Sequence, residues 1–264
     1  MTDGESSPQP ASSKDRAPEG MAGLAKGLAI IEAFGSSHEH LTVASAAAVA
    51  GISRASARRC LLTLTDAGYL FRQGSKYRPT PRMLRLGAAY YESASLPQLA
   101  ETHLEAARDK LHESISLAIL EDGYAVFVAR VEAERIISSL AKLGGRLPAY
   151  ASATGRVLLA AQSVKTLNEY LDTTKLLKLT PATIIDREQL RERIEKIGHD
   201  GYEITINELE EGMVSVAVPV MDNHQNTVAA MSMSASSARI STNRLRKDFL
   251  PILQTYASKL SQSL

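Results

Sequence analysis

The sequence of 264 residues contains one cysteine, no tryptophan and no long apolar run. Because Cys60 is the single cysteine, the chain can form neither an internal disulfide nor a cysteine-based zinc site. A lack of disulfides is typical of a protein in a reducing compartment. No window reaches the roughly 18 consecutive apolar residues that a membrane helix needs, and the N-terminus lacks the basic-then-apolar pattern of a secretory signal. We therefore expect a cytoplasmic protein that does not contact a membrane.

Short motifs of several enzyme classes are also missing. The sequence has no phosphate loop with Gly-Lys-Ser/Thr, no Gly-x-Ser-x-Gly turn, no His-Glu-x-x-His helix and no Gly-x-Gly-x-x-Gly fingerprint. The histidines show no ligand spacing: they are His38, His40, His103, His112, His199 and His224. We therefore predict no catalytic residue, no metal site and no cofactor, although a catalytic triad can assemble from residues far apart in the sequence.

The nearly neutral chain, of net charge +1, conceals an uneven charge distribution. Residues 21–95 carry nine Lys and Arg against four Asp and Glu, a net charge of +5, whereas residues 1–20 and 96–264 each carry −2. A local basic excess suits a surface that binds a polyanion, because each phosphate neutralised by Lys or Arg releases counterions. A solvated basic face is the alternative.

Residues 1–20 are rich in Ser, Pro and charge and are expected to be a disordered leader. Beyond them, Leu24, Leu28 and Ile31 recur at helical spacing and predict an amphipathic helix over 22–34.

Two short helices and a hairpin follow. Thr42 is expected to cap a helix that ends at Gly51, and Ser53 to cap another that runs to about Ala67. The tight turn between them is the signature of a helix-turn-helix. Residues 69–78 predict a basic hairpin, so the whole is a winged helix.

The second of these two helices has two different sides at 100° per residue. Ala57, Leu61 and Leu64 fall on one side, while Arg59 and Thr63 fall on the other. One face is therefore expected to pack on the core and the other to be polar and basic.

The rest of the chain predicts an α+β fold. Thr80 and Pro81 start a linker helix over 81–95 with an apolar side, and residues 96–264 form a mixed sheet covered by helices. Strands are expected at 115–120, 124–131, 135–141, 203–207, 214–221 and 227–234, and helices from Pro97 onward and at 152–161, 165–172, 187–198 and 242–261. Gly198 is the expected stop of the fourth of these helices.

Seven short segments, four in the first half and three in the second, form a recognisable set. They are GLAKGLAIIEAF (23–34), LTVA (41–44), GISRASARRCLLTL (51–64), GYL (68–70), GRLP (145–148), SATGRVLLA (152–160) and AAMSMS (229–234). Together they resemble the IclR family of bacterial transcriptional regulators over about residues 21–262. The run PTPRMLRLG (79–87) is further similar to the subfamily that regulates protocatechuate and 4-hydroxybenzoate catabolism.

This resemblance implies a winged helix-turn-helix over 21–80, the linker helix over 81–95 and a GAF-like effector-binding domain over 96–264. It implies a homodimer or a dimer of dimers on double-stranded DNA, and two recognition helices about 34 Å apart require an approximately palindromic operator. The expected function is control of a catabolic operon by a small effector, an aromatic carboxylic acid or a related compound. The alternative is a small-molecule carrier or enzyme whose winged helix binds another protein.

Candidate DNA contacts lie on the outward helix face, at the helix caps and on the wing. Arg59 is best placed for a bidentate contact to guanine, and Arg54 and Arg58 for phosphates. Wing residues position the protein on the backbone or minor groove. The set is Thr42, Ser53, Arg54, Ser56, Arg58, Arg59, Thr63, Lys76 and Arg78.

Candidate effector contacts gather around a predicted helix start and the last strands. The free amides of Ala153 and Thr154 make a cradle for a carboxylate, and Ser232 and Ser234 share one strand face. The resemblance carries the effector site over to Ala153, Thr154, Thr205, Met213, Ser215, Ser232 and Ser234, with Ile136 and Leu147 as an apolar wall. Ser152, which opens the same helix, completes the candidate set. Thr205 and Ser215 stand where some relatives carry an acidic residue and a cysteine, a change compatible with an aromatic acid.

Overall fold

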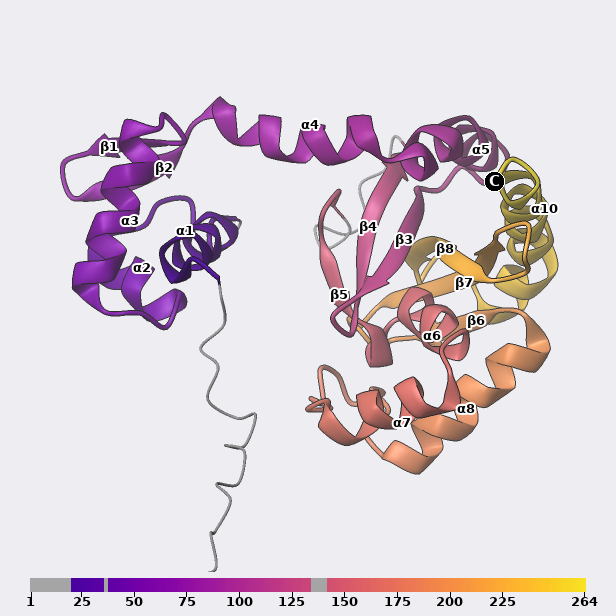
Figure 1. The fold of residues 1–264 in the computed structure, drawn as a ribbon. Coiled ribbons are helices and arrows are strands. Elements are labelled where there is room, and N and C mark those ends of the chain that lie inside the picture. The colour runs from indigo at the N-terminus through magenta and orange to yellow at the C-terminus, as the bar shows by residue number, and fades with distance from the viewer. Residues whose placement is uncertain (1–19, 36–37, 134–141) are drawn as a thin grey trace, which may run out of the picture. The chain divides into compact units, whose positions relative to one another are not determined.

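A computed structural model of the chain describes residues 20–35, 38–133 and 142–264 and divides into two compact units, Met1–Ala89 and Tyr90–Leu264 (Figure 1). The expected leader lies outside the described residues except for Gly20, as does the strand expected at 135–141. No helix in the described ranges is long and apolar enough to cross a membrane.

The first unit is a winged helix-turn-helix, as predicted. Its elements are α1 (Ala22–Glu32), α2 (Val43–Val49), α3 (Arg54–Asp66), β1 (Leu70–Gln73) and β2 (Lys76–Pro79). The antiparallel wing turns at Gly74, whose φ of +61° favours glycine. Tyr77 of the wing is buried and exchanges two backbone hydrogen bonds with Leu41, which ties the wing to the helices.

The expected buried stripe of α1 is wrong within the single chain. Leu24 and Leu28 are 61% and 45% exposed, whereas Ile30 is fully buried in the core with Ala57 and Leu61. Because α1 is apolar on most of its surface, with only Lys26 and Glu32 charged, periodicity does not decide which side packs on α3.

The linker begins with a 3₁₀ turn (η1, Pro81–Met83) and continues as α4 (Leu84–Ser93). Thr80 caps the turn by accepting a hydrogen bond from the Arg82 N–H and donates its own hydroxyl to the Gly68 carbonyl. The helix is confirmed, but no residue of α4 is buried, and Leu84 is 75% exposed. Its apolar side is therefore open in the single chain.

The second unit is built on a six-stranded antiparallel sheet of order β5-β4-β3-β8-β7-β6. The strands are β3 (Ile115–Glu121), β4 (Tyr124–Val131), β5 (Arg146–Pro148), β6 (Glu203–Ile206), β7 (Met213–Met221) and β8 (Thr227–Ser236). The helices are α5 (Ser95–Leu111), η2 (Ala149–Ala151), α6 (Ala153–Ala160), α7 (Val164–Thr173), α8 (Arg187–Asp200), α9 (Thr242–Arg244), a π-helical turn η3 (Leu245–Phe249) and α10 (Leu250–Ser261).

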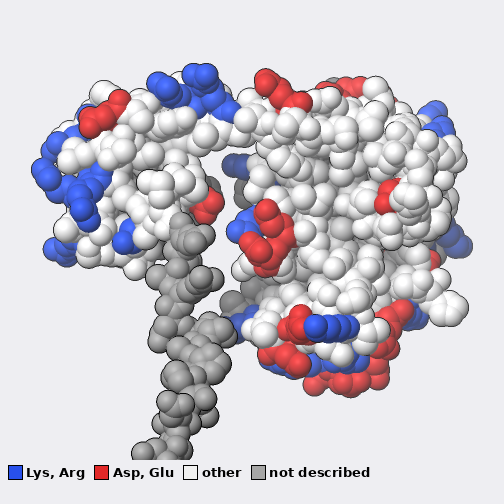
Figure 2. Space-filling model, in the orientation of Figure 1, with Lys and Arg blue, Asp and Glu red and all other residues white. Residues whose placement is uncertain are grey.

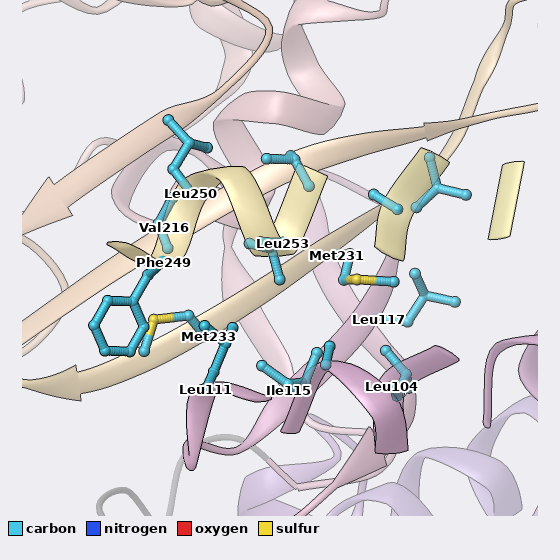
Figure 3. Close-up of a cluster of buried hydrophobic side chains, with 14 of the residues drawn as sticks. Leu104, Leu111, Ile115, Leu117, Val216, Met231, Met233, Phe249, Leu250 and Leu253 are labelled. Atoms are coloured by element: carbon cyan, nitrogen blue, oxygen red, sulfur yellow. The ribbon is translucent and has the colours of Figure 1, made fainter. Parts of the chain in front are cut away.

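The two faces of this sheet carry different side chains. One face packs under α5 and α10: Ile115 and Met231 of the sheet lie in one cluster with Leu104 of α5 and Leu253 of α10 (Figure 3). The opposite face, which lies under α6, holds smaller residues, alanines among them. Strand alternation thus separates a large apolar core from a face with room for polar groups.

Two predicted boundaries differ from the structure. Helix α8 does not stop at Gly198 but continues to Asp200, because Gly201 takes the left-handed cap with φ of +72°. The single helix expected over 242–261 is interrupted by the π-helical turn just before Pro251, which lacks an N–H and would clash in a regular helix. The short β5 was not expected at all.

Candidate functional site

The outward face of α3 carries free arginines. Arg54, Arg58 and Arg59 are exposed, as is Thr63, and Ser56 is half-buried. None of the three guanidinium groups forms a salt bridge with a residue that the structure describes. The face is therefore available for an anionic partner.

The two cap residues of the helix-turn-helix use their hydroxyls locally. Thr42 Oγ1 accepts from the Ser45 N–H at 3.2 Å, and Ser45 Oγ accepts from the Thr42 N–H at 2.8 Å, which makes a capping box. Ser53 Oγ accepts from the Ser56 N–H at 3.2 Å. Both residues fix the ends of their helices, whatever else they contact.

The wing adds two exposed cations, Lys76 and Arg78. Arg72 is different, because its Nε donates to the Gly74 carbonyl at 2.9 Å and its guanidinium lies 5.8 Å from the centre of the Tyr77 ring. Figure 2 shows the basic side chains of the first unit gathered over the wing and the helix-turn-helix and at the start of α4.

The polar residues expected in the second unit form a row across three strands. Thr205 on β6 is in register with Ser215 on β7, which is in register with Ser234 on β8. The hydroxyls of Ser215 and Ser234 are hydrogen-bonded at 2.7 Å. Ser232 lies two residues before Ser234 on the same face. These four predicted residues are thus brought together under α6.

The start of α6 supplies two N–H donors. Ser152 caps the helix by accepting from the Gly155 N–H at 3.1 Å, so its hydroxyl is already in use. The N–H groups of Ala153 and Thr154, in the first turn, have no acceptor among the described residues. Both residues are buried.

The hydroxyls of three buried residues share this lack of described partners. Within the described ranges, no hydrogen bond is made by the side chains of Thr154, Thr205 or Ser232. None of the three hydroxyl oxygens is a fully enclosed atom without a partner, which among the described residues is the case for Glu113 Oε2. With the N–H groups of α6, the three hydroxyls make the α6 face of the sheet suited to a polar molecule.

Three predicted effector contacts remain. Leu147 is buried on β5, at the other edge of the sheet from Thr205 on β6, and belongs to the same apolar cluster as Ala153. Met213 begins β7 and is half-buried. Ile136 lies outside the described residues.

A buried ion-pair network holds α6 in place, and sequence reasoning missed it. Arg156 of α6 is fully buried; its Nε donates to the Tyr150 carbonyl at 2.7 Å and its Nη1 to Glu203 at 3.0 Å. The same guanidinium pairs with Glu208, and Arg193 of α8 donates to both oxygens of Glu203. An arginine inside an otherwise small and apolar helix was the signal in the sequence.

Gly155, three residues after the Ser152 cap, lies where α6 comes closest to η2. A Cβ at this position would lie 2.2 Å from the Cα of Ala149 and 2.5 Å from its carbonyl oxygen. Only glycine lets α6 approach η2 this closely, and the approach sets where the free N–H groups of α6 lie.

Arg130 on β4 is the second residue that sequence reasoning missed. It is in register with Ser116 of β3, and its Nη1 donates to Ser116 Oγ at 2.8 Å. Because Ser116 is in turn in register with Ser232, a cation stands at one end of the polar face.

The chain matches two family models along most of its length. The "IclR helix-turn-helix domain" matches residues 23–74, and the "Bacterial transcriptional regulator IclR C-terminal" matches residues 88–262.

Curated relatives and solved structures agree with these matches. The chain is 39% identical to the Pca regulon regulatory protein of Pseudomonas putida, over 94% of this chain and 85% of that protein. It is 35% identical to the p-hydroxybenzoate hydroxylase transcriptional activator of Acinetobacter baylyi, over 91% and 90%. A transcriptional regulator structure from Rhodococcus sp. RHA1 is 39% identical with a TM-score of 0.81, over 92% and 98%. A homologue from Microbacterium hydrocarbonoxydans complexed with 4-hydroxybenzoate is 25% identical with a TM-score of 0.76, over 91% and 98%.

Proposed function

Because the chain belongs to the IclR family of bacterial transcriptional regulators, we propose that a small aromatic acid bound in the second unit controls its affinity for operator DNA. The chain is a regulator and not an enzyme. One observation carries the effector half of the proposal: hydroxyls of buried residues and helix N–H groups, both without described partners, lie on one face of the sheet. As a regulator of a bacterial operon it would act in the cytoplasm.

We assign a role to each segment: residues 21–80 bind DNA, residues 81–95 connect the two domains, and residues 96–264 bind the effector. Leu24 and Leu28 on α1, together with Leu84 and Tyr90 on α4, expose large apolar side chains. A second copy of the chain would cover such surfaces, so we propose a homodimer, or a dimer of dimers. A dimer would present its two recognition helices to successive major grooves of an approximately palindromic operator.

Arg59 tests the DNA-binding face. Its truncation, Arg59→Ala, should weaken operator binding about tenfold or more, since a bidentate contact to guanine contributes roughly 1–3 kcal/mol of discrimination. The measurement is a gel shift on an operator selected from a random DNA pool. Arg187→Ala, which removes an exposed arginine of α8, is the control and should bind as the wild type. Equal affinity of both variants would remove Arg59 from the interface.

Several features of the α6 face favour an aromatic acid. The helix start offers N–H donors and a favourable dipole to an anion, and the hydroxyl row offers donors and acceptors to ring oxygens. A relative named as the p-hydroxybenzoate hydroxylase transcriptional activator and a homologue complexed with 4-hydroxybenzoate point to the same chemical class. Effector control then requires that the ligand bind two arrangements of the regulator with different affinity.

Thr154 tests the effector site. Thr154→Phe should abolish the effect of 4-hydroxybenzoate on the gel shift and leave operator binding intact, because the new ring fills the space beside the α6 N-terminus. Thr255→Phe, at an exposed position of α10, is the matched control and should respond as the wild type. Retained operator binding shows that the variant is folded. An unchanged response to the acid would refute this location for the site.

A further inference from the structure

Arg130 is largely buried on the polar face of the sheet. Its side chain is 12% exposed, and its register with the buried Ser116 puts it on the face that α6 covers. The hydrogen bond from Nη1 to Ser116 Oγ at 2.8 Å directs the guanidinium across β3. From there the next residue in register is Ser232 on β8, one strand spacing of about 4.8 Å away.

The charge of Arg130 is less well compensated than that of the other arginines on this side. Arg156 and Arg193 share the buried Glu203, and Arg156 also pairs with Glu208. Arg130 meets only Glu132 among the described carboxylates, through a single contact of 3.4 Å, and the Glu132 side chain is 59% exposed. A buried cation with so weak a counter-charge is costly unless another anion binds it.

The donors of Arg130 are also incompletely used. A guanidinium has five N–H donors in a planar fork, and the described partners of Arg130 are one hydroxyl and one carboxylate oxygen. A ligand carboxylate matches such a fork and forms stronger hydrogen bonds with it than a neutral group does. Ser232 lies next in this row, beyond Ser116, with a hydroxyl that has no described partner.

We propose that Arg130 binds the carboxylate of the effector and thereby selects acids over neutral aromatic molecules. The inference rests on the proposed function, since it assigns a role within the same effector site. The partial charges at the α6 N-terminus favour any acceptor oxygen, whereas a full positive charge distinguishes an anion from its uncharged analogue. The N–H groups of Ala153 and Thr154 are then left for a second oxygen of the same ligand.

The test compares an acid with its neutral amide in the full-length protein. Calorimetric titration with 4-hydroxybenzoate and 4-hydroxybenzamide should show that the wild type binds the acid at least about tenfold more tightly. In Arg130→Gln the affinity for the acid should fall about 30-fold, the effect of removing one partner of a desolvated charge pair, while affinity for the amide stays within about threefold. Arg130→Lys keeps the charge without the fork and should lie between the two.

Arg191→Gln is the matched control, because Arg191 is a partly buried arginine of α8 that bonds Asn168 and Glu188. It should retain the wild-type preference for the acid. An acid-to-amide ratio that is the same in Arg130→Gln and the wild type would overturn the role of Arg130 while leaving the effector site in place. Failure of the wild type to bind any carboxylate would overturn the role of Arg130 together with the proposed effector class. If Arg130→Gln loses operator binding and is misfolded, the ratio in Arg130→Lys decides: a wild-type ratio there overturns the proposal and a reduced one supports it.

Discussion

Substitution of Gly155 by alanine should destabilise the second unit, although alanine is the better helix former. The added Cβ would meet the Cα, carbonyl carbon and carbonyl oxygen of Ala149 at 2.2, 2.7 and 2.5 Å, all of them backbone atoms. Relief to an ordinary contact of 3.4 Å requires α6 and η2 to separate by about 1.2 Å, the difference between 3.4 and 2.2 Å. Such a shift stretches the hydrogen bond from Arg156 Nε of α6 to the Tyr150 carbonyl of η2, which spans 2.7 Å.

The expected loss combines three contributions. Overpacking costs roughly 1–3 kcal/mol, weakened hydrogen bonds to a charged group add about 1.5–3 kcal/mol, and helix propensity returns about 1 kcal/mol. A net loss of about 1.5–5 kcal/mol lowers the Tm of a domain of this size by roughly 3–20 °C. Differential scanning calorimetry of the full-length protein measures the shift.

The same change at Gly198 provides the control. This glycine lies inside α8, and a Cβ added there meets no atom within 4 Å. Gly198→Ala should therefore raise the Tm, since the helix gains up to about 1 kcal/mol in propensity without a clash. Shifts of the same sign in both variants would refute the reasoning from the close approach of α6 to η2.

Three further changes test other parts of the structure. Arg156→Met should lower the free energy of unfolding by about 3–5 kcal/mol in urea titration, because Glu203 and Glu208 lose a buried partner; a loss below about 1 kcal/mol would contradict this. Leu28→Glu should shift the protein from dimer to monomer in light scattering, and a dimer that persists would exclude this part of α1 from the interface. Binding of 4-hydroxybenzoate should slow hydrogen exchange in β3, β4 and α5 as well as at the start of α6, and protection confined to α6 and β6 would argue against ligand contact at Arg130.

The first unit was largely predictable because its signals are local. Thr42 and Ser53 cap the helices that they were expected to cap, and the glycine at 74 turns the wing. The exception, the buried side of α1, depends on tertiary contact, since a helix that is apolar on both sides contains no information about which side its own chain covers.

The second unit was predictable in its elements but not in its site. The strands expected at 214–221 and 227–234 match β7 and β8 to within two residues. Which strands become neighbours is a matter of long-range pairing: Ser116 and Ser232 are 116 residues apart yet lie in register. The position of Arg130 beside them follows from this register and from a bulge in β3 and β4, neither of which periodicity reveals.

The pairing of Arg130 with Ser116 also bears on how a bound acid would be sensed. Arg156 ties α6 to β6 through buried charges, so that side of the site is held in place with or without a ligand. By contrast, β3 and β4 pack on α5, and Gln98 of α5 donates to the carbonyl of Tyr91 at the end of the linker. An anion bound by Arg130 would therefore act on the strands that support α5 and leave the charge network around α6 complete. Its binding energy would be used on the side of the site that is connected to the linker through α5.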